Sequence, residues 1–129
     1  MPATILLIED DPDYRDLIAY RLRSAGHTVR IASNGQDGLE QAREQAPDLI
    51  LTDLMLPKLN GYEICSLLKQ DQRYQRIPIV VFSATKMHDR DAKLAKECGA
   101  NAYVLKSVEP KLLVEQVNAL LAPPASATP

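Results

Sequence analysis

Three carboxylates in this sequence follow short apolar runs, and their positions predict a shared cation site. Glu9 and Asp10 come directly after the run Ile5–Ile8. Asp53 follows the run Leu49–Thr52. Short, continuous apolar runs bounded by polar residues are typical of buried parallel strands. Since the carboxyl ends of parallel strands share the edge of the sheet where ligands bind, we expect the three acids to meet there.

Carboxylates that lie close together repel one another, so the cluster needs a positive partner. At 4 Å the repulsion is about 4 kcal/mol per pair in a medium with an effective dielectric near 20. A bound cation relieves this repulsion, and a site with oxygen ligands only favours Mg²⁺. We therefore expect Glu9, Asp10 and Asp53 to bind Mg²⁺.

A hydroxyl and an ammonium group are expected at the rim of the same crevice. Ser83 follows the apolar run Ile79–Phe82, and Lys106 follows the run Tyr103–Leu105. Both runs again suit strands of a parallel sheet, whose carboxyl ends lie at the common edge. The predicted site therefore combines acids, a hydroxyl and a lysine.

Short apolar runs alternate with longer helical patterns five times along the chain. This alternation predicts βαβ units with right-handed crossovers and helices on both faces of a parallel sheet. The expected fold class is α/β, a flavodoxin-like (βα)5 doubly wound fold with strand order 2-1-3-4-5 and five flanking helices. The expected strands are Thr4–Ile8, His27–Ala32, Asp48–Asp53, Ile79–Ser83 and Asn101–Lys106.

Capping residues and apolar periodicity mark the expected helices. Asp11 and Pro12 suit a helix start, and Gly26 suits its end. The other helices are expected over Gly35–Ala46, from Asn60 with Glu63 in a capping box, over Asp89–Cys98, and from Glu109–Pro110. The side chains expected to face the core include Tyr14, Leu17, Ile18, Leu22 and Ala25 in the first helix and Ile64, Leu67 and Leu68 in the third.

Composition indicates one globular domain. The chain has 129 residues, 46% of them hydrophobic, and a net charge of −2, which gives no reason to expect a nucleic-acid or anionic-membrane surface. It has neither a bilayer-length apolar run nor a secretory signal, so a cytoplasmic location is expected. Residues 1–122 are expected to form the domain, and residues 123–129 a disordered Pro/Ala-rich tail or linker stub.

The two cysteines, Cys65 and Cys98, lie far apart in sequence in two predicted helices. They could form a disulfide or a redox pair. The simpler interpretation is two reduced, partly buried thiols that contribute to packing.

With these residues in place, the sequence resembles the receiver domain of two-component response regulators, the CheY-like family. The resemblance covers about residues 3–122 and rests on four segments that occur in order and at the family's spacing. The segments are Ile5–Asp11, Pro47–Gly61, Ile77–Ala84 and Gly99–Lys106.

The resemblance implies a role for each residue of the predicted site. Asp53 matches the phosphoacceptor, and Ser83 and Lys106 match the residues that contact the phosphoryl group. Glu9 and Asp10 match the acidic pair that binds Mg²⁺ together with the phosphoacceptor. Met55 matches the position whose backbone carbonyl would ligate the metal, and Tyr103 matches the aromatic switch residue. Met55 and Thr85 also match the two positions that tune the lifetime of the phosphoryl group.

The resemblance also implies partners. A sensor histidine kinase or histidine phosphotransfer protein would supply the phosphoryl group, and a downstream effector would bind the face of the fourth helix, fifth strand and fifth helix. Catalysis is expected only as Mg-assisted self-phosphorylation and autodephosphorylation. No DNA-binding domain follows in this sequence, so a stand-alone regulator is expected, without direct contact to nucleic acid or membrane. A homodimer through the same face, and a larger regulator of which this is a fragment, stay open.

One position departs from the family pattern. Ser107 follows Lys106, where the family usually has proline, often with a cis peptide bond. A non-proline cis bond costs about 2.5–4 kcal/mol, so a trans bond is expected here. This difference bears on the placement of Lys106 more than on the acceptor role of Asp53.

Other functions fit the sequence less well. A receiver-like scaffold that is not phosphorylated would keep the fold, and Ser107 alone supports it. A phosphatase of the haloacid dehalogenase type needs a second Asp two residues after the first, where this chain has Met55. A flavodoxin needs a Gly/Ser/Thr phosphate cradle after the first strand, where this chain is acidic.

Overall fold

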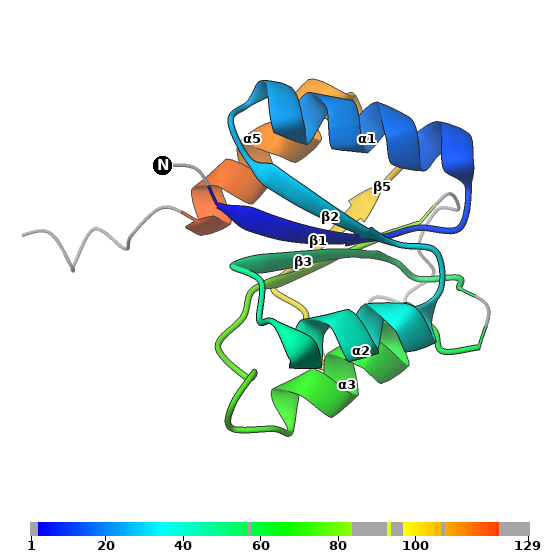
Figure 1. The fold of residues 1–129 in the computed structure, drawn as a ribbon, viewed down its shortest axis with the longest axis vertical. Coiled ribbons are helices and arrows are strands. Elements are labelled where there is room, and N and C mark those ends of the chain that lie inside the picture. The colour runs from blue at the N-terminus through cyan, green and yellow to red at the C-terminus, as the bar shows by residue number, and fades with distance from the viewer. Residues whose placement is uncertain (1–2, 57, 84–92, 94–96, 107, 122–129) are drawn as a thin grey trace, which may run out of the picture.

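The computed structural model describes residues 3–56, 58–83, 93, 97–106 and 108–121, which form a three-layer α/β structure (Figure 1). A five-stranded sheet lies between the helices, and all its strand pairs are parallel. Its order, β2-β1-β3-β4-β5, confirms the predicted flavodoxin-like fold. The strands are β1 (Thr4–Ile8), β2 (Thr28–Ala32), β3 (Leu49–Asp53), β4 (Ile79–Ser83) and β5 (Ala102–Leu105).

Helices cover both faces of the sheet (Figure 1). On one face lie α1 (Pro12–Ser24) and α5 (Pro110–Leu121), and on the other lie α2 (Gly35–Glu44) and α3 (Gly61–Lys69). The predicted fourth helix, over Asp89–Cys98, falls mainly outside the described residues, as do Thr85, Ser107 and the predicted tail. No helix in the described ranges is long and apolar enough to span a membrane.

The helix starts follow from their capping residues. The Asp11 side chain accepts a hydrogen bond from the backbone N–H of Asp13 at 3.1 Å, so α1 begins directly after the acids that follow β1. Asn60 and Glu63 form the predicted capping box at the start of α3, with hydrogen bonds of 3.0 and 3.3 Å. Such caps contribute about 1 kcal/mol each. They fix where the chain leaves the carboxyl edge of the sheet.

The buried apolar side chains form two clusters, one on each face of the sheet. Ile5 and Leu7 of β1 join the cluster under α1 and α5, while Leu6 and Ile8 join the cluster under α2 and α3. This alternation follows from the two-residue period of a strand. β3 lies in the middle of the sheet and is buried along its whole length, which places Asp53 in a buried position.

Three apolar residues predicted to face the core are exposed instead. Leu17 and Leu67 have 42% and 41% of their surface exposed, and Ala25 is the exposed C-cap of α1. Ala19 and Cys65 are buried in their place. Successive residues are rotated by about 100° around a helix, so a small change in the contact line exchanges one edge of the apolar stripe for the other.

Gly35 allows α2 to pack directly against the loop that follows β3. A Cβ added at Gly35 would overlap the backbone oxygen of Leu59, which can move only if the loop moves. We therefore expect Gly35→Ala to lower the free energy of unfolding by about 3 kcal/mol, at the upper end of overpacking effects, as measured by urea denaturation.

Gly26→Ala is the matched control for this substitution. A Cβ there would meet nothing within 4 Å, although the φ angle of +97° disfavours a side chain. The expected loss of unfolding free energy is about 1 kcal/mol. An equal or smaller loss for Gly35→Ala would contradict the close packing of α2 on this loop.

Candidate phosphoacceptor and metal site

Glu9, Asp10 and Asp53 lie together at the carboxyl edge of the sheet. One ligand oxygen from each residue lies within 4.8 Å of the others. The register of β1 and β3 pairs Ile8 with Thr52, so the residues that follow these two positions are neighbours. Glu9 and Asp53 are buried and Asp10 is exposed, so the cluster opens to solvent on one side.

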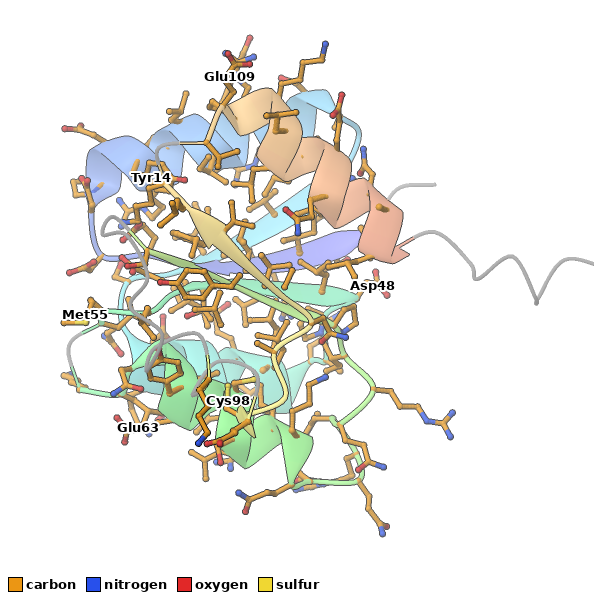
Figure 2. All side chains as sticks on the ribbon, turned by 180° about the vertical axis from the view of Figure 1, so that it is seen from behind. Tyr14, Asp48, Met55, Glu63, Cys98 and Glu109 are labelled. Atoms are coloured by element: carbon orange, nitrogen blue, oxygen red, sulfur yellow. The ribbon has the colours of Figure 1, made fainter. Side chains whose placement is uncertain are left out.

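Three labelled side chains show which end of the sheet this is. Tyr14 in the first turns of α1 and Met55 after β3 lie at the same end of the sheet (Figure 2). Asp48, which precedes β3, lies at the opposite end (Figure 2). The site therefore occupies the carboxyl end of the strands, where ligands bind in open parallel sheets.

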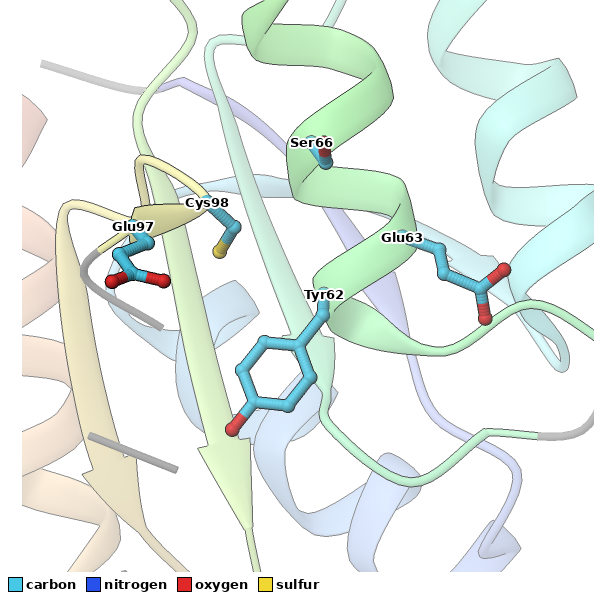
Figure 3. Close-up of a pocket in the computed structure, with 5 residues that line it drawn as sticks. All are labelled: Tyr62, Glu63, Ser66, Glu97 and Cys98. Carbon is cyan, nitrogen blue, oxygen red and sulfur yellow. The ribbon is translucent and has the colours of Figure 1, made fainter. Parts of the chain in front are cut away.

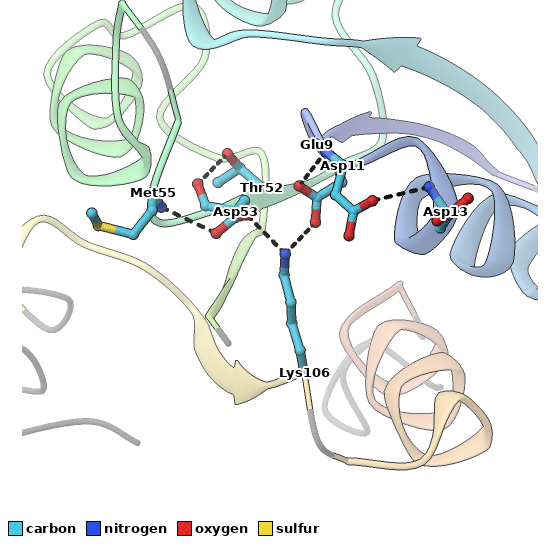
Figure 4. Close-up of polar contacts among 7 residues, drawn as sticks. All are labelled: Glu9, Asp11, Asp13, Thr52, Asp53, Met55 and Lys106. Carbon is cyan, nitrogen blue, oxygen red and sulfur yellow. Dashed lines mark hydrogen bonds and ion pairs between the residues drawn. The ribbon is translucent and has the colours of Figure 1, made fainter. Parts of the chain in front are cut away.

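Lys106 places its ammonium group between two of the acids. Its Nζ lies 2.5 Å from Glu9 Oε1 and 2.9 Å from Asp53 Oδ2 (Figure 4). The backbone explains this reach, because Leu105 pairs with Ser83 and the N–H of Lys106 donates to the Ser83 carbonyl at 2.8 Å. The end of β5 is thus held beside the ends of β3 and β4.

Two aromatic rings line the path of the Lys106 side chain. Its Nζ lies 4.7 Å from the ring centroid of Tyr14 and 5.4 Å from that of Phe82. The two rings are themselves 5.5 Å apart and tilted by 47°. A cation over an aromatic face gains about 1 kcal/mol. These rings therefore help to hold the ammonium group over the acids.

Tyr14 is a site residue that the sequence interpretation missed. We expected it to face the core as part of an apolar stripe, with no part in the site. Its position in the first turns of a helix that starts at the acidic edge was the available signal. That signal is weak, because the partner, Lys106, comes from the far end of the chain.

Hydrogen bonds from two neighbouring residues hold the carboxylate and the backbone of Asp53. The N–H of Met55 donates to Asp53 Oδ1 at 3.0 Å, and the Thr52 hydroxyl donates to the backbone oxygen of Asp53 at 3.1 Å (Figure 4). The Met55 side chain points to solvent and is 72% exposed, so only the backbone of this residue reaches the carboxylate. A metal bond to its carbonyl stays a prediction.

The two predicted switch residues lie on the strands next to Asp53. Ser83 is buried at the end of β4, and Asp53 pairs with Phe82, the residue before it. Tyr103 of β5 is half-buried and packs against the edge of the cluster under α2 and α3. Their roles in switching stay predictions, and Thr85 lies outside the described residues.

Burial shifts the pKa values of charged groups at this site, and the contacts among these groups shift them further. Burial raises the pKa of Glu9 from 4.5 to about 7, although a hydrogen bond from Lys106 lowers it. Burial lowers the pKa of the Lys106 ammonium, but its bonds to Glu9 and Asp53 outweigh burial and leave this pKa above its ordinary value. The lysine therefore stays charged, while Glu9 holds a proton in part near neutral pH.

Without metal, Glu9 should make the free energy of unfolding depend on pH. The folded state binds more protons between about pH 4.5 and about pH 7, so the free energy of unfolding falls as pH rises through this window. The pKa shift corresponds to at most about 3 kcal/mol. Since Glu9→Gln removes the titrating group, we expect it to flatten this dependence and to raise stability near pH 8 by about 1–2 kcal/mol.

The measurement is urea denaturation in EDTA near pH 5 and near pH 8. Asp16→Asn is the control, because the Asp16 side chain is 74% exposed and lies on the outer side of α1. A Glu9→Gln protein with the parent's pH dependence would contradict the raised pKa of Glu9.

The residues present fit a hard divalent cation. The cluster offers carboxylate oxygens only, which suit Mg²⁺ rather than a softer metal. Mg²⁺ keeps several waters, so the exposed side of the cluster at Asp10 suits it. Glu9, Asp10 and Asp53 are the side chains that would hold the ion.

Comparison with known proteins agrees with this geometry. The chain matches the response regulator receiver domain family over residues 5–118. It is 40% identical over 121 residues to transcriptional regulatory protein AfsQ1 of Streptomyces coelicolor, covering 94% of this chain and 52% of AfsQ1. It is 35% identical over 120 residues to protein PilH of Pseudomonas aeruginosa, covering 93% and 98% of the two chains. The chain thus spans about half the length of AfsQ1 and nearly all of PilH.

A solved structure adds the same fold with a metal ion. The receiver domain of the sensor histidine kinase PA1611 from Pseudomonas aeruginosa was crystallised with a magnesium ion coordinated in its active-site cleft. It superimposes with a TM-score of 0.85 at 28% identity, covering 94% of this chain and 98% of that one. Proteins of this family are signalling proteins rather than enzymes in the usual sense. The chain therefore belongs to the receiver domain family of two-component response regulators, as its sequence segments predicted.

Proposed function

We propose that this chain is a phosphoacceptor switch that receives a phosphoryl group on Asp53 from a histidine kinase or a histidine phosphotransfer protein, in a Mg-dependent reaction. The observation that carries the proposal is the placement of a buried carboxylate, Asp53, 2.9 Å from the Lys106 ammonium and beside two further acids. A lysine and further carboxylates beside the acceptor carboxylate are groups that suit phosphoryl transfer.

The chemistry assigns a task to each group. An oxygen of Asp53 attacks phosphorus, the bond from phosphorus to the donor breaks, and an acyl phosphate forms. Lys106 neutralises charge on the equatorial oxygens, which is the main catalytic need in phosphoryl transfer. Mg²⁺, held by Glu9, Asp10, Asp53 and the Met55 carbonyl, would add positive charge at the same oxygens. The magnesium ion in the PA1611 receiver domain supports this assignment.

Phosphorylation would act on two residues near the site. The new phosphoryl oxygens would accept a hydrogen bond from Ser83, which is buried at the end of β4. Movement of Ser83 would open space into which the half-buried Tyr103 turns. The two packings of such a switch differ by a few kcal/mol, so one local charge can reset their populations.

The output surface in this proposal is the face of the predicted fourth helix, β5 and α5. A downstream effector would bind it, and dimerisation through the same face is the alternative use of this surface. The curated relatives include regulators named as DNA-binding, of which this chain spans about half. We assign to this domain a role through protein contacts in the cytoplasm, without direct contact to nucleic acid.

The proposal is tested with a small phosphoryl donor. The full chain is incubated with acetyl phosphate and Mg²⁺, and its intact mass is measured. We expect the mass to rise by one phosphoryl group with Mg²⁺ and to stay unchanged in EDTA, because the acids need a cation before an anion can approach. A parent protein that stays unmodified with Mg²⁺ would favour the scaffold that is not phosphorylated.

A further inference from the structure

Cys65 and Cys98 form a thiol pair between α3 and the turn that precedes β5. The Cys65 thiol donates a hydrogen bond to the backbone oxygen of Cys98 at 3.2 Å. Neither of the two is part of a disulfide, so both sulfur atoms are thiols. The fold thus brings together two cysteines that are 33 residues apart in sequence.

The two thiols differ in their access to solvent. Cys65 is fully buried, whereas Cys98 is half-buried and lines a shallow hollow of about 340 Å³ (Figure 3). The hollow is also lined by Tyr62, Glu63, Ser66 and Glu97. A small reagent in this hollow meets Cys98 first, and Cys65 lies behind it.

A lysine lies next to the thiol pair. Lys69 is one helical turn after Cys65, and its Nζ donates to the backbone oxygens of Ile77 and Gln75 at 2.7 and 3.0 Å. Burial raises the pKa of the Cys65 thiol, and the Lys69 charge opposes this rise. Its Cγ would lie 2.9 Å from a Cβ added at Gly99, so the lysine stem packs on the turn that carries Cys98.

The charges around the hollow select the kind of oxidant. Glu97 places a carboxylate at the wall next to Cys98 (Figure 3), and this charge repels anionic oxidants such as a glutathione disulfide. Hydrogen peroxide is small and uncharged, so it enters without this repulsion. A half-exposed thiol next to a second thiol has the accessibility and the proximity that a redox-sensitive pair needs.

We propose that Cys65 and Cys98 form a redox pair that hydrogen peroxide closes to an intramolecular disulfide. The sulfur of Cys98 attacks one peroxide oxygen, the O–O bond breaks, and the products are a sulfenic acid and water. The sulfur of Cys65 then attacks the sulfenic sulfur, the S–O bond breaks, and a second water leaves with the Cys65 proton. Two electrons pass from the thiols to peroxide.

The disulfide would constrain the segment that leads into β5. Cys98 and Gly99 form the turn before this strand, and Lys106 lies directly after it. A covalent bond to α3 would fix the start of the strand whose end reaches the acidic site. Because the crosslink also restricts the unfolded chain, the oxidised protein should melt at a higher temperature than the reduced protein.

The test treats the full chain with a slight excess of hydrogen peroxide, alkylates the remaining thiols and maps the peptides by mass. We expect one monomeric product in which the Cys65 and Cys98 peptides are linked, with a raised melting temperature, and full reversal by dithiothreitol. A disulfide between two chains, alkylation of both thiols, or a sulfinic acid at Cys98 would each overturn the proposal.

Two variants assign the order of the steps. In Cys65→Ala, the sulfenic acid on Cys98 should persist and react with dimedone, because no thiol lies behind it. In Cys98→Ala, Cys65 should be oxidised at least about tenfold more slowly than in the parent, because it is buried. Oxidation of Cys65 in Cys98→Ala at the rate seen in the parent would contradict the proposed order. The peptide map of the parent protein tests the disulfide itself, whether or not either variant folds.

Discussion

Asp53→Asn is expected to abolish phosphorylation of this protein by acetyl phosphate. The amide that replaces the carboxylate is a poor nucleophile toward phosphorus, and removal of a nucleophile lowers rates by at least about 10³-fold. The asparagine oxygen can still accept the hydrogen bond from the Met55 N–H, so the local backbone should be kept. The measurement is the intact mass after incubation with Mg²⁺ and acetyl phosphate.

Asp11→Asn is the matched control for Asp53→Asn. Asp11 lies at the same edge of the sheet, but it is exposed and caps α1 by accepting a hydrogen bond from the backbone N–H of Asp13. Asparagine is an equally good cap, so the helix should be unaffected. We expect the parent's yield of phosphorylated protein. Phosphorylation of the Asp53→Asn protein at the parent's rate would refute the acceptor role.

Lys106→Met is expected to slow phosphorylation by about 10²–10³-fold, because the ammonium that faces Asp53 is lost. Methionine keeps an apolar stem of similar length beside the Tyr14 and Phe82 rings. Mg²⁺ affinity should stay the same or rise, since a cation that shares the acids is removed. The measurements are the rate of mass increase with acetyl phosphate and a Mg²⁺ titration.

Slower phosphorylation without a loss of Mg²⁺ affinity separates an electrostatic role of Lys106 from damage to the fold. A loss of Mg²⁺ affinity together with phosphorylation would indicate that Lys106 mainly supports the structure. Lys111→Met is the control, because Lys111 lies exposed in the first turn of α5. It should leave both quantities unchanged. A Lys106→Met protein that is phosphorylated at the parent's rate would remove the lysine from the proposed chemistry.

Strands with sharp polar boundaries were predictable from the sequence. β1 and β4 have the predicted bounds, because each is a continuous apolar run that forms an inner strand of the sheet. The positions of Leu17 and Leu67 were wrong, because a helical pattern defines a stripe but not which edge of it meets the neighbouring element. That choice depends on packing with helices distant in sequence.

The convergence of the acids was also predictable, since it follows from strand direction alone. The difference between Glu9 and Asp10 was not. The Glu9 N–H continues the ladder to β2 by donating to the Ala32 carbonyl at 3.0 Å, which turns its side chain inward and leaves Asp10 exposed. The raised pKa of Glu9 and the ring contacts of Lys106 likewise depend on tertiary distances that spacing does not encode.

The most direct measurement is the position of the phosphoryl group in the protein. Borohydride reduces an aspartyl phosphate to homoserine, which peptide mass analysis locates after digestion. The account predicts homoserine in place of Asp53 after incubation with acetyl phosphate and Mg²⁺, and unmodified Asp53 in EDTA. Homoserine at Asp10 or another acid, with Asp53 unmodified, would contradict it.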